Sequence, residues 1–211
     1  MKKSFFVAVL ASAIACPAVS FAAGMGPYVS ANIGAAILND ATWTDIVYGP
    51  VGVEYDTGIG VTGAVGYDMG MTRVEFEFGF RRNDIDNLDF GVGGRYPGSG
   101  DVTSSSFMFN GYYDFENGSP LTPYLGAGLG LATVRAEDAY DFFNEDADDT
   151  AFAFLFIAGL GYQMTPNILL DISYRYFATS SDLDLEGVDY IVDVDRYESH
   201  NIMVGVRFLY F

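Results

Sequence analysis

The chain has 211 residues, of which 50% are hydrophobic, and it carries 28 acidic residues against 10 lysines and arginines, a formal net charge of -18. This length suits one domain. A field of that sign repels nucleic acid and anionic lipid head groups, so we expect neither as a partner.

The first 22 residues have the pattern of a secretory signal peptide: a basic start, an apolar run over residues 5–15 and small residues before Ala22. We expect cleavage after Ala22, leaving residues 23–211 as one domain. The apolar run is too short for a membrane-spanning helix. The only cysteine, Cys16, lies inside this segment, so the mature chain would have no disulfide. The alternative is a lipoprotein that begins at a lipidated Cys16.

Eight segments alternate between apolar and other side chains, which predicts β-strands with one apolar face. They cover residues 28–38, 58–68, 72–82, 105–115, 122–134, 150–163, 168–177 and 199–211. About ten residues is the length that a tilted strand needs to cross a bilayer. The segment 150–163 is apolar on both faces and would also fit a helix by composition, but phenylalanine at every second position favours a strand.

The segment 72–82 shows the alternation most clearly. Its apolar side chains are Val74, Phe76, Phe78 and Phe80, and they alternate with Arg73, Glu75, Glu77, Gly79 and Arg81. Large apolar groups opposite four charges do not fit a strand buried in a soluble core. This pattern predicts one face toward lipid and the other toward a polar interior.

The connections alternate in length. Short turns rich in turn-forming residues occupy 69–71, 116–121 and 164–167, whereas the other four connections have roughly 15 to 20 residues. Short turns on one side of a membrane and long loops on the other are typical of outer-membrane barrels. The sequence therefore predicts an all-β fold, an eight-stranded antiparallel up-and-down transmembrane β-barrel with four long external loops and three short periplasmic turns.

Aromatic residues on the apolar phase lie within a residue or two of each short turn or of the C-terminus. They are Tyr67, Tyr113, Phe115, Tyr162 and Tyr210. Aromatic rings prefer the head-group level of a bilayer, so these five predict a periplasmic girdle. Another aromatic set, Phe80, Phe107, Phe152 and Tyr176, falls at the opposite strand ends.

The leader, the eight alternating strands, the short turns and the aromatic C-terminal strand resemble the OmpA/OmpX-type, Opa-like family of eight-stranded outer-membrane β-barrels. The resemblance implies a monomer in the bacterial outer membrane, contact with outer-membrane lipid, and recognition of the last strand by the barrel assembly machinery. The terminal aromatic residue would be Tyr210 with one extra residue, or Phe211 out of phase. We expect no peptidoglycan-binding domain after the eighth strand.

Eight charged residues lie on the inward phase of the predicted strands. They are Arg73, Glu75, Glu77, Arg81, Asp114, Asp171, Arg175 and Arg207. The interior of an eight-stranded barrel is filled by side chains, and unpaired charges there are costly. Equal numbers of opposite charges therefore predict a paired, hydrogen-bonded plug. The alternative is a gate or narrow conductance path that opens when these pairs rearrange.

The predicted loops hold 22 of the 28 carboxylates, which favours a solvated surface, although excess carboxylate oxygens also attract calcium. In the fourth loop, the spacing of a calcium-binding loop is matched by Asp182, Asp184, Glu186 and Asp193. Calcium is therefore a candidate ligand, and we expect no other cofactor. The alternative is that the neighbouring strands continue beyond the membrane as a hairpin turning near Gly187.

The sequence has few features that would predict an enzyme. His200 is the only histidine and lies on the outward phase near the outer rim. Lipid A deacylases of similar architecture have a histidine and, two residues later, a serine, where this chain has Ile202. We therefore expect no enzyme. Two functions remain: a surface antigen or adhesion-type scaffold whose acidic loops meet an extracellular protein or cation, or a small porin-like channel through a narrow charged lumen.

Overall fold

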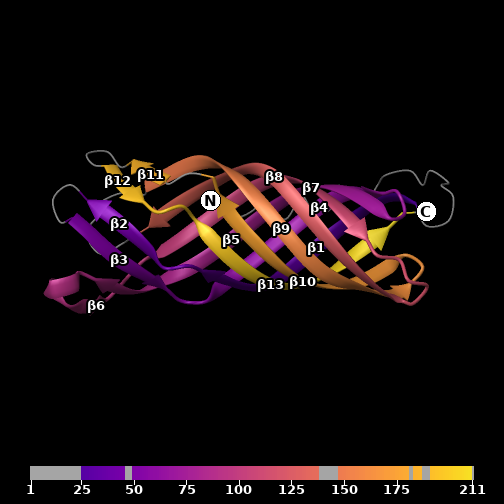
Figure 1. The fold of residues 1–211 in the computed structure, drawn as a ribbon, viewed down its shortest axis with the longest axis horizontal. Helices are drawn as coiled ribbons and strands as arrows, with labels where there is room; N and C mark the ends of the chain where they lie inside the picture. The colour runs from indigo at the N-terminus through magenta and orange to yellow at the C-terminus, as the bar shows by residue number, and fades with distance from the viewer. Residues whose placement is uncertain (1–24, 46–48, 138–146, 181–182, 187–190, 211) are drawn as a thin grey trace, which may run out of the picture.

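The computed structural model describes residues 25–45, 49–137, 147–180, 183–186 and 191–210 as a closed antiparallel barrel (Figure 1). In this part of the chain, eight strands form the main wall: β1 (Gly26–Leu38), β4 (Gly58–Asp68), β5 (Thr72–Asp89), β7 (Asp101–Asp114), β8 (Leu121–Glu137), β9 (Ala147–Thr165), β10 (Ile168–Thr179) and β13 (Glu198–Leu209). Each pairs with the next, and β1 pairs with β13 to close the barrel. The predicted up-and-down barrel is confirmed.

The barrel has the inverted polarity that lipid requires. On the outer surface, Phe107, Leu129 and Phe156 have more than half of their area exposed. In the interior, Glu77 and Asn110 are fully buried. Because successive side chains of a strand point to opposite faces, the alternation in sequence produces this inside-out arrangement directly. Within the ranges described, no helix is long and apolar enough to cross a membrane.

The short turns follow the predicted pattern. After β4, Met69 N–H donates to the carbonyl oxygen of Thr72 at 2.9 Å, and Gly70 N–H donates to Asp68 Oδ1 at 2.8 Å. Gly70 has a φ of 93°, a left-handed conformation that favours glycine. This turn therefore joins β4 and β5 without extending the wall.

The long connections differ from the expected loops, because they contain further short strands. These are β2 (Ala41–Asp45), β3 (Gly49–Tyr55), β6 (Arg95–Pro97), β11 (Leu183–Glu186) and β12 (Ile191–Val194), with a 3₁₀ helix, η2 (Gly91–Gly93). β3 pairs with the end of β5, β2 with β3 and β12, and β11 with β12 and β9. The barrel wall therefore continues beyond the membrane as an extension, which we call the outer storey.

The outer storey has an apolar interior. Its buried residues include Leu38, Trp43, Val51, Val53, Ile85, Leu88, Val102, Leu183 and Tyr197. On β3, Val51 and Val53 alternate with Gly52 and Glu54, so this strand turns an apolar face inward. The protein thus buries its charged groups within the membrane wall, while its apolar core extends from residues of that wall, such as Met108 and Leu155, into the outer storey.

Candidate functional site

The lumen of the membrane wall holds all eight charged residues predicted to face inward. Their burial is nearly complete: Glu77 is 0% exposed and Arg81 is 1% exposed, and both acid side chains of the later strands, Asp114 and Asp171, are under 10% exposed. A charge in such a place is costly without a partner, so the contacts that each one makes decide what the lumen can do.

One cluster forms around Arg73 and Glu75 on β5. Arg73 Nε lies 2.9 Å from Asp114 Oδ2, and Arg73 Nη1 lies 3.5 Å from Glu75 Oε1. The hydroxyls of Tyr28 and Tyr112 each donate to Glu75 at 2.8 Å. The Arg73 guanidinium also lies 3.9 Å from the centre of the Tyr112 ring. This arrangement satisfies both acids and places the cation against an aromatic face.

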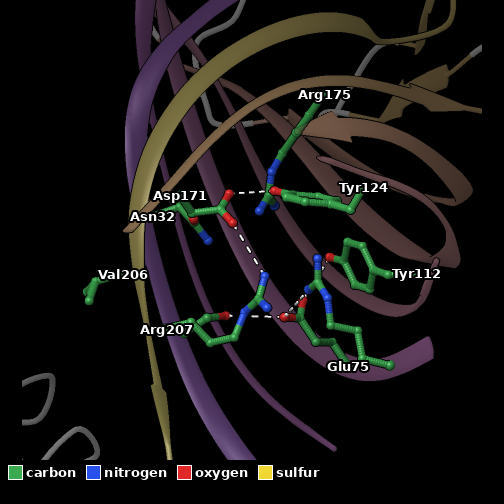
Figure 2. Close-up of a pocket in the computed structure, with 10 residues that line it drawn as sticks. Asn32, Glu75, Tyr112, Tyr124, Asp171, Arg175, Val206 and Arg207 are labelled. Atoms are coloured by element: carbon green, nitrogen blue, oxygen red, sulfur yellow. Dashed lines mark hydrogen bonds and ion pairs between the residues drawn. The ribbon is translucent and has the colours of Figure 1, made fainter. Parts of the chain in front are cut away.

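Two further ion pairs lie in the lumen. Arg175 Nη1 on β10 lies 2.6 Å from Glu77 Oε2 on β5. Arg207 Nη2 on β13 lies 3.4 Å from Asp171 Oδ2 on β10, and Tyr124 donates to the other oxygen of that carboxylate at 2.5 Å. Figure 2 shows Arg207, Asp171 and Tyr124 of these residues close together in the lumen. The first pair ties together strands that are not neighbours in the sheet, whereas the second joins the paired strands β10 and β13.

Arg81 departs from the expected one-to-one pairing. Its Nη1 donates to Ser106 Oγ at 3.3 Å, and its guanidinium lies 4.0 Å from the centre of the Phe177 ring. The numbers of arginines and acids are equal, but Arg73 contacts two of the carboxylates, Glu75 and Asp114. The hydrogen-bonded plug thus includes Arg81 through a hydroxyl and an aromatic ring, where the equal charge numbers predict a carboxylate partner.

A small polar pocket remains among these groups (Figure 2). Ser30, Asn32, Tyr112, Tyr124 and Val206 line it with the charged residues around them. Measured by where the centre of a water molecule can lie, its volume is about 10 Å³, roughly the room for one water. Side chains therefore fill this section of the lumen almost completely.

The apolar interior of the outer storey lies above the ion pairs. Trp43 is 7% exposed and donates from its indole nitrogen to the Tyr55 hydroxyl at 3.0 Å. Burial raises the pKa of the Tyr55 hydroxyl well above its usual range. Buried apolar side chains therefore pack above the charged lumen in the described part of the outer storey.

The predicted girdle residues lie on the outer surface. Tyr67, Tyr113, Phe115 and Tyr162 are 36–46% exposed, and the rings of Tyr113 and Phe115 are 5.0 Å apart. Tyr210 follows the end of β13, where its N–H donates to the carbonyl oxygen of Pro27 at 3.0 Å. Phe211, the other candidate for the terminal aromatic, lies outside the described residues.

The candidate calcium residues lie on a β-hairpin. The strands β11 and β12 pair antiparallel, with Asp184 opposite Asp193 and Glu186 opposite Ile191. This backbone is the alternative predicted from the alternation, and a hairpin differs from a calcium-binding loop. Asp182, the first proposed ligand, lies outside the described residues, and calcium binding stays a prediction.

His200 contacts aromatic side chains on the outer surface. The Tyr174 hydroxyl lies 2.6 Å from His200 Nδ1, and the ring of Tyr176 has its centre 5.3 Å from that of His200. Ile202 is 53% exposed on the same face. The surroundings of this histidine are those of an interfacial aromatic cluster.

Comparison with known proteins identifies the family. The model of the outer membrane protein beta-barrel domain matches residues 6–208. Outer membrane protein PagN of Salmonella typhimurium is 31% identical over 83% of both chains, and a putative adhesin of Rickettsia akari is 24% identical over 99% of both. Among solved structures, Neisserial surface protein A is 25% identical, with a TM-score of 0.58 over 88% of this chain and 97% of its own. The chain therefore belongs to the outer membrane protein β-barrel family and is a protein of the bacterial outer membrane.

Proposed function

We propose that this protein is an adhesion-type surface scaffold, a non-enzymatic barrel that holds an acidic outer storey above the membrane for contact with an extracellular partner. The observation that carries the proposal is the filled interior: ion pairs and tyrosines occupy the lumen, and a packed apolar layer covers them. A barrel filled in this way acts through its outer surface.

The surface of the outer storey supplies the means of contact. On the outward face of β5, Asp84, Asp86 and Asp89 are exposed in succession beyond the membrane wall. Such a row attracts a basic partner and steers its approach, an effect that weakens as salt screens the charges. The names of the relatives, which include putative adhesins, support a role in attachment.

The test compares bacteria that display the wild-type protein with bacteria that display D84N/D86N/D89N. We expect the wild type to increase attachment to cultured animal cells over an empty-vector strain, and the triple variant to lose most of that increase. The matched control is D114N, which neutralises one carboxylate inside the lumen. Attachment by the triple variant equal to that of the wild type, with equal surface display, would overturn the proposal.

A second candidate function is a narrow channel for solutes. The polar pocket between Arg73, Asp171 and Arg207 favours it, because charged, hydrated lumens conduct ions when their pairs rearrange. Single-channel recording of the refolded protein separates the two functions. Steady large conductance by the wild type would support the channel, and a silent bilayer with attachment by intact cells would support the scaffold.

A further inference from the structure

Three methionines lie together at the periplasmic end of the barrel, around the turn between β4 and β5. Met69 and Met71 flank Gly70 in this turn. The third, Met25, comes directly before β1. Their side chains are 43–55% exposed, whereas Met108 in the lumen is fully buried. A ligand in the periplasm can therefore reach the three thioethers.

The pairing of β1 with β4 brings Met25 to this turn. Gly26 pairs with Asp68 in that register, so Met25 and Met69 are the next residues beyond the pair. A Cβ on Gly70 would lie 3.3 Å from the terminal methyl carbon of Met25, so this side chain lies against the backbone of the turn. The thioether of Met25 is therefore next to a glycine that has a methionine on each side in the sequence.

Backbone hydrogen bonds fix the turn, whereas its methionine side chains can adapt to a ligand. The N–H groups of Met69 and Gly70 both donate within the turn. The Tyr113 hydroxyl lies 3.9 Å from Met71 Sδ, a weak contact that a stronger ligand of the sulfur can replace. Because the methionine side chain is unbranched and flexible, the three sulfurs can converge on one ion without a change in the backbone.

The chemistry of these side chains selects the ion. Thioether sulfur is a soft ligand that favours Cu(I), whereas carboxylate and water oxygens favour hard ions such as Mg²⁺ and Ca²⁺. The negative field of the chain attracts cations, and Asp68 adds a carboxylate directly next to the turn. We propose that Met25, Met69 and Met71 bind a soft monovalent cation, Cu(I), at the periplasmic rim of the barrel through their three sulfur atoms.

Met164 is a single thioether at the same end of the barrel. It lies near the end of β9 with 56% exposure, and the connection from β9 to β10 holds no other methionine. In the main wall, β7 and β8 separate β5 from β9, while β13 and β1 separate β10 from β4. Met164 therefore has the exposure of the proposed ligands but lies away from them, which makes it a matched control. The inference concerns the periplasmic end and is independent of the proposed attachment function.

The test titrates the full mature chain, refolded in detergent, with Ag(I) in a buffer free of chloride. Ag(I) has the soft character of Cu(I) and needs no reductant. The mature chain would offer it no cysteine and only one histidine as competing ligands. Isotope-labelled methionine methyl groups report the ligands by NMR. We expect the signals of Met25, Met69 and Met71 to shift together, and the signal of Met164 to stay in place.

Two variants separate the proposed site from single exposed methionines. M69L/M71L should bind Ag(I) about tenfold more weakly than the wild type, since two of the three sulfur ligands are lost while leucine keeps the apolar volume. M164L should bind Ag(I) as tightly as the wild type. Cu(I), kept reduced with ascorbate, should displace Ag(I) from the wild type. Heat-dependent gel mobility of each variant shows that its barrel is folded.

Three results would overturn the proposal. One is equal affinity of M69L/M71L and the wild type for Ag(I). Another is an equal loss of affinity in M164L and M69L/M71L, which would indicate that exposed thioethers bind the ion separately. The third is displacement of Ag(I) by millimolar Ca²⁺, which would indicate carboxylate ligands.

Discussion

The ring of Tyr124 lies against the bare backbone of Gly159, its direct partner across the β8–β9 pair. A Cβ on Gly159 would come within 2.3 Å of the hydroxyl oxygen of Tyr124. The same relationship joins two further pairs, Tyr112 with Gly126 and Tyr28 with Gly66. Each of these three tyrosines thus lies across a glycine, which lets the ring lie flat along the wall and brings its hydroxyl to the ion pairs.

This relationship predicts that G159A destabilises the barrel. The added methyl group would push Tyr124 away from Asp171, to which its hydroxyl donates, so the substitution combines overpacking with a lost hydrogen bond. We expect a loss of about 1–3 kcal/mol in the free energy of unfolding. Guanidinium titration in micelles measures it. The control is G63A on the outward face of β4, where a Cβ would meet nothing within 4 Å, and equal stability of the two variants would contradict the prediction.

The two kinds of buried arginine should respond differently to replacement by an apolar residue. R175L would leave Glu77 as a buried carboxylate without its partner, at a cost of about 3–5 kcal/mol. R81L would remove a hydrogen bond to Ser106 and a ring contact with Phe177 while Glu77 keeps Arg175 as its ion-pair partner, so we expect a smaller loss. Unfolding midpoints of both variants under one condition provide the measurement. A larger loss for R81L than for R175L would mean that a buried carboxylate depends on Arg81 as its counterion.

The membrane wall was predictable because a strand that faces lipid has an apolar side chain at every second position of the sequence. The predicted range of β4 agrees with the structure, and inward positions such as Glu77 and Arg175 followed from the phase alone. The partner of each charge was not predictable, because shear places residues from distant strands opposite one another. Thus Arg175 meets Glu77 across 98 residues of sequence, and Arg81 meets Phe177 instead of an acid.

The outer storey was missed for a different reason. Its strands are short: in β3, Val51, Val53 and Tyr55 alternate with Gly52 and Glu54 within a strand of only 7 residues. That alternation was the available signal. The sequence does not show which face of β3 points inward, because an apolar face forms a core only against an opposite wall. The pairing of β3 with the end of β5 determines that face.

The periplasmic girdle predicts a stability effect that depends on lipid. Tyr162 lies at the short-turn end of β9 and is 45% exposed. Replacement by alanine should lower the free energy of unfolding from bilayers by about 1 kcal/mol, because the ring loses its place at the head-group level. The control is Y96A, since Tyr96 on β6 has a similar exposure of 49% but lies in the outer storey. A similar loss for both variants, measured in vesicles, would argue against the girdle.

The apolar layer of the outer storey predicts that its packing can be uncoupled from the ion pairs of the membrane wall. Val53 is 1% exposed, so V53D would place a carboxylate in this layer without a partner and should unpack it. Trp43, the only tryptophan, lies in the same layer and reports its packing. We expect V53D to shift the fluorescence of Trp43 to the red and to expose β2 and β3 to proteinase K. The ion pairs of the membrane wall lie elsewhere, so the heat-dependent gel mobility should persist.

T44D is the control, because Thr44 is the exposed neighbour of Trp43 and an acid there meets water. Loss of heat-dependent mobility by V53D would show that the membrane wall does not fold without a packed outer storey. An unchanged Trp43 spectrum would show that water already reaches this layer in the wild type.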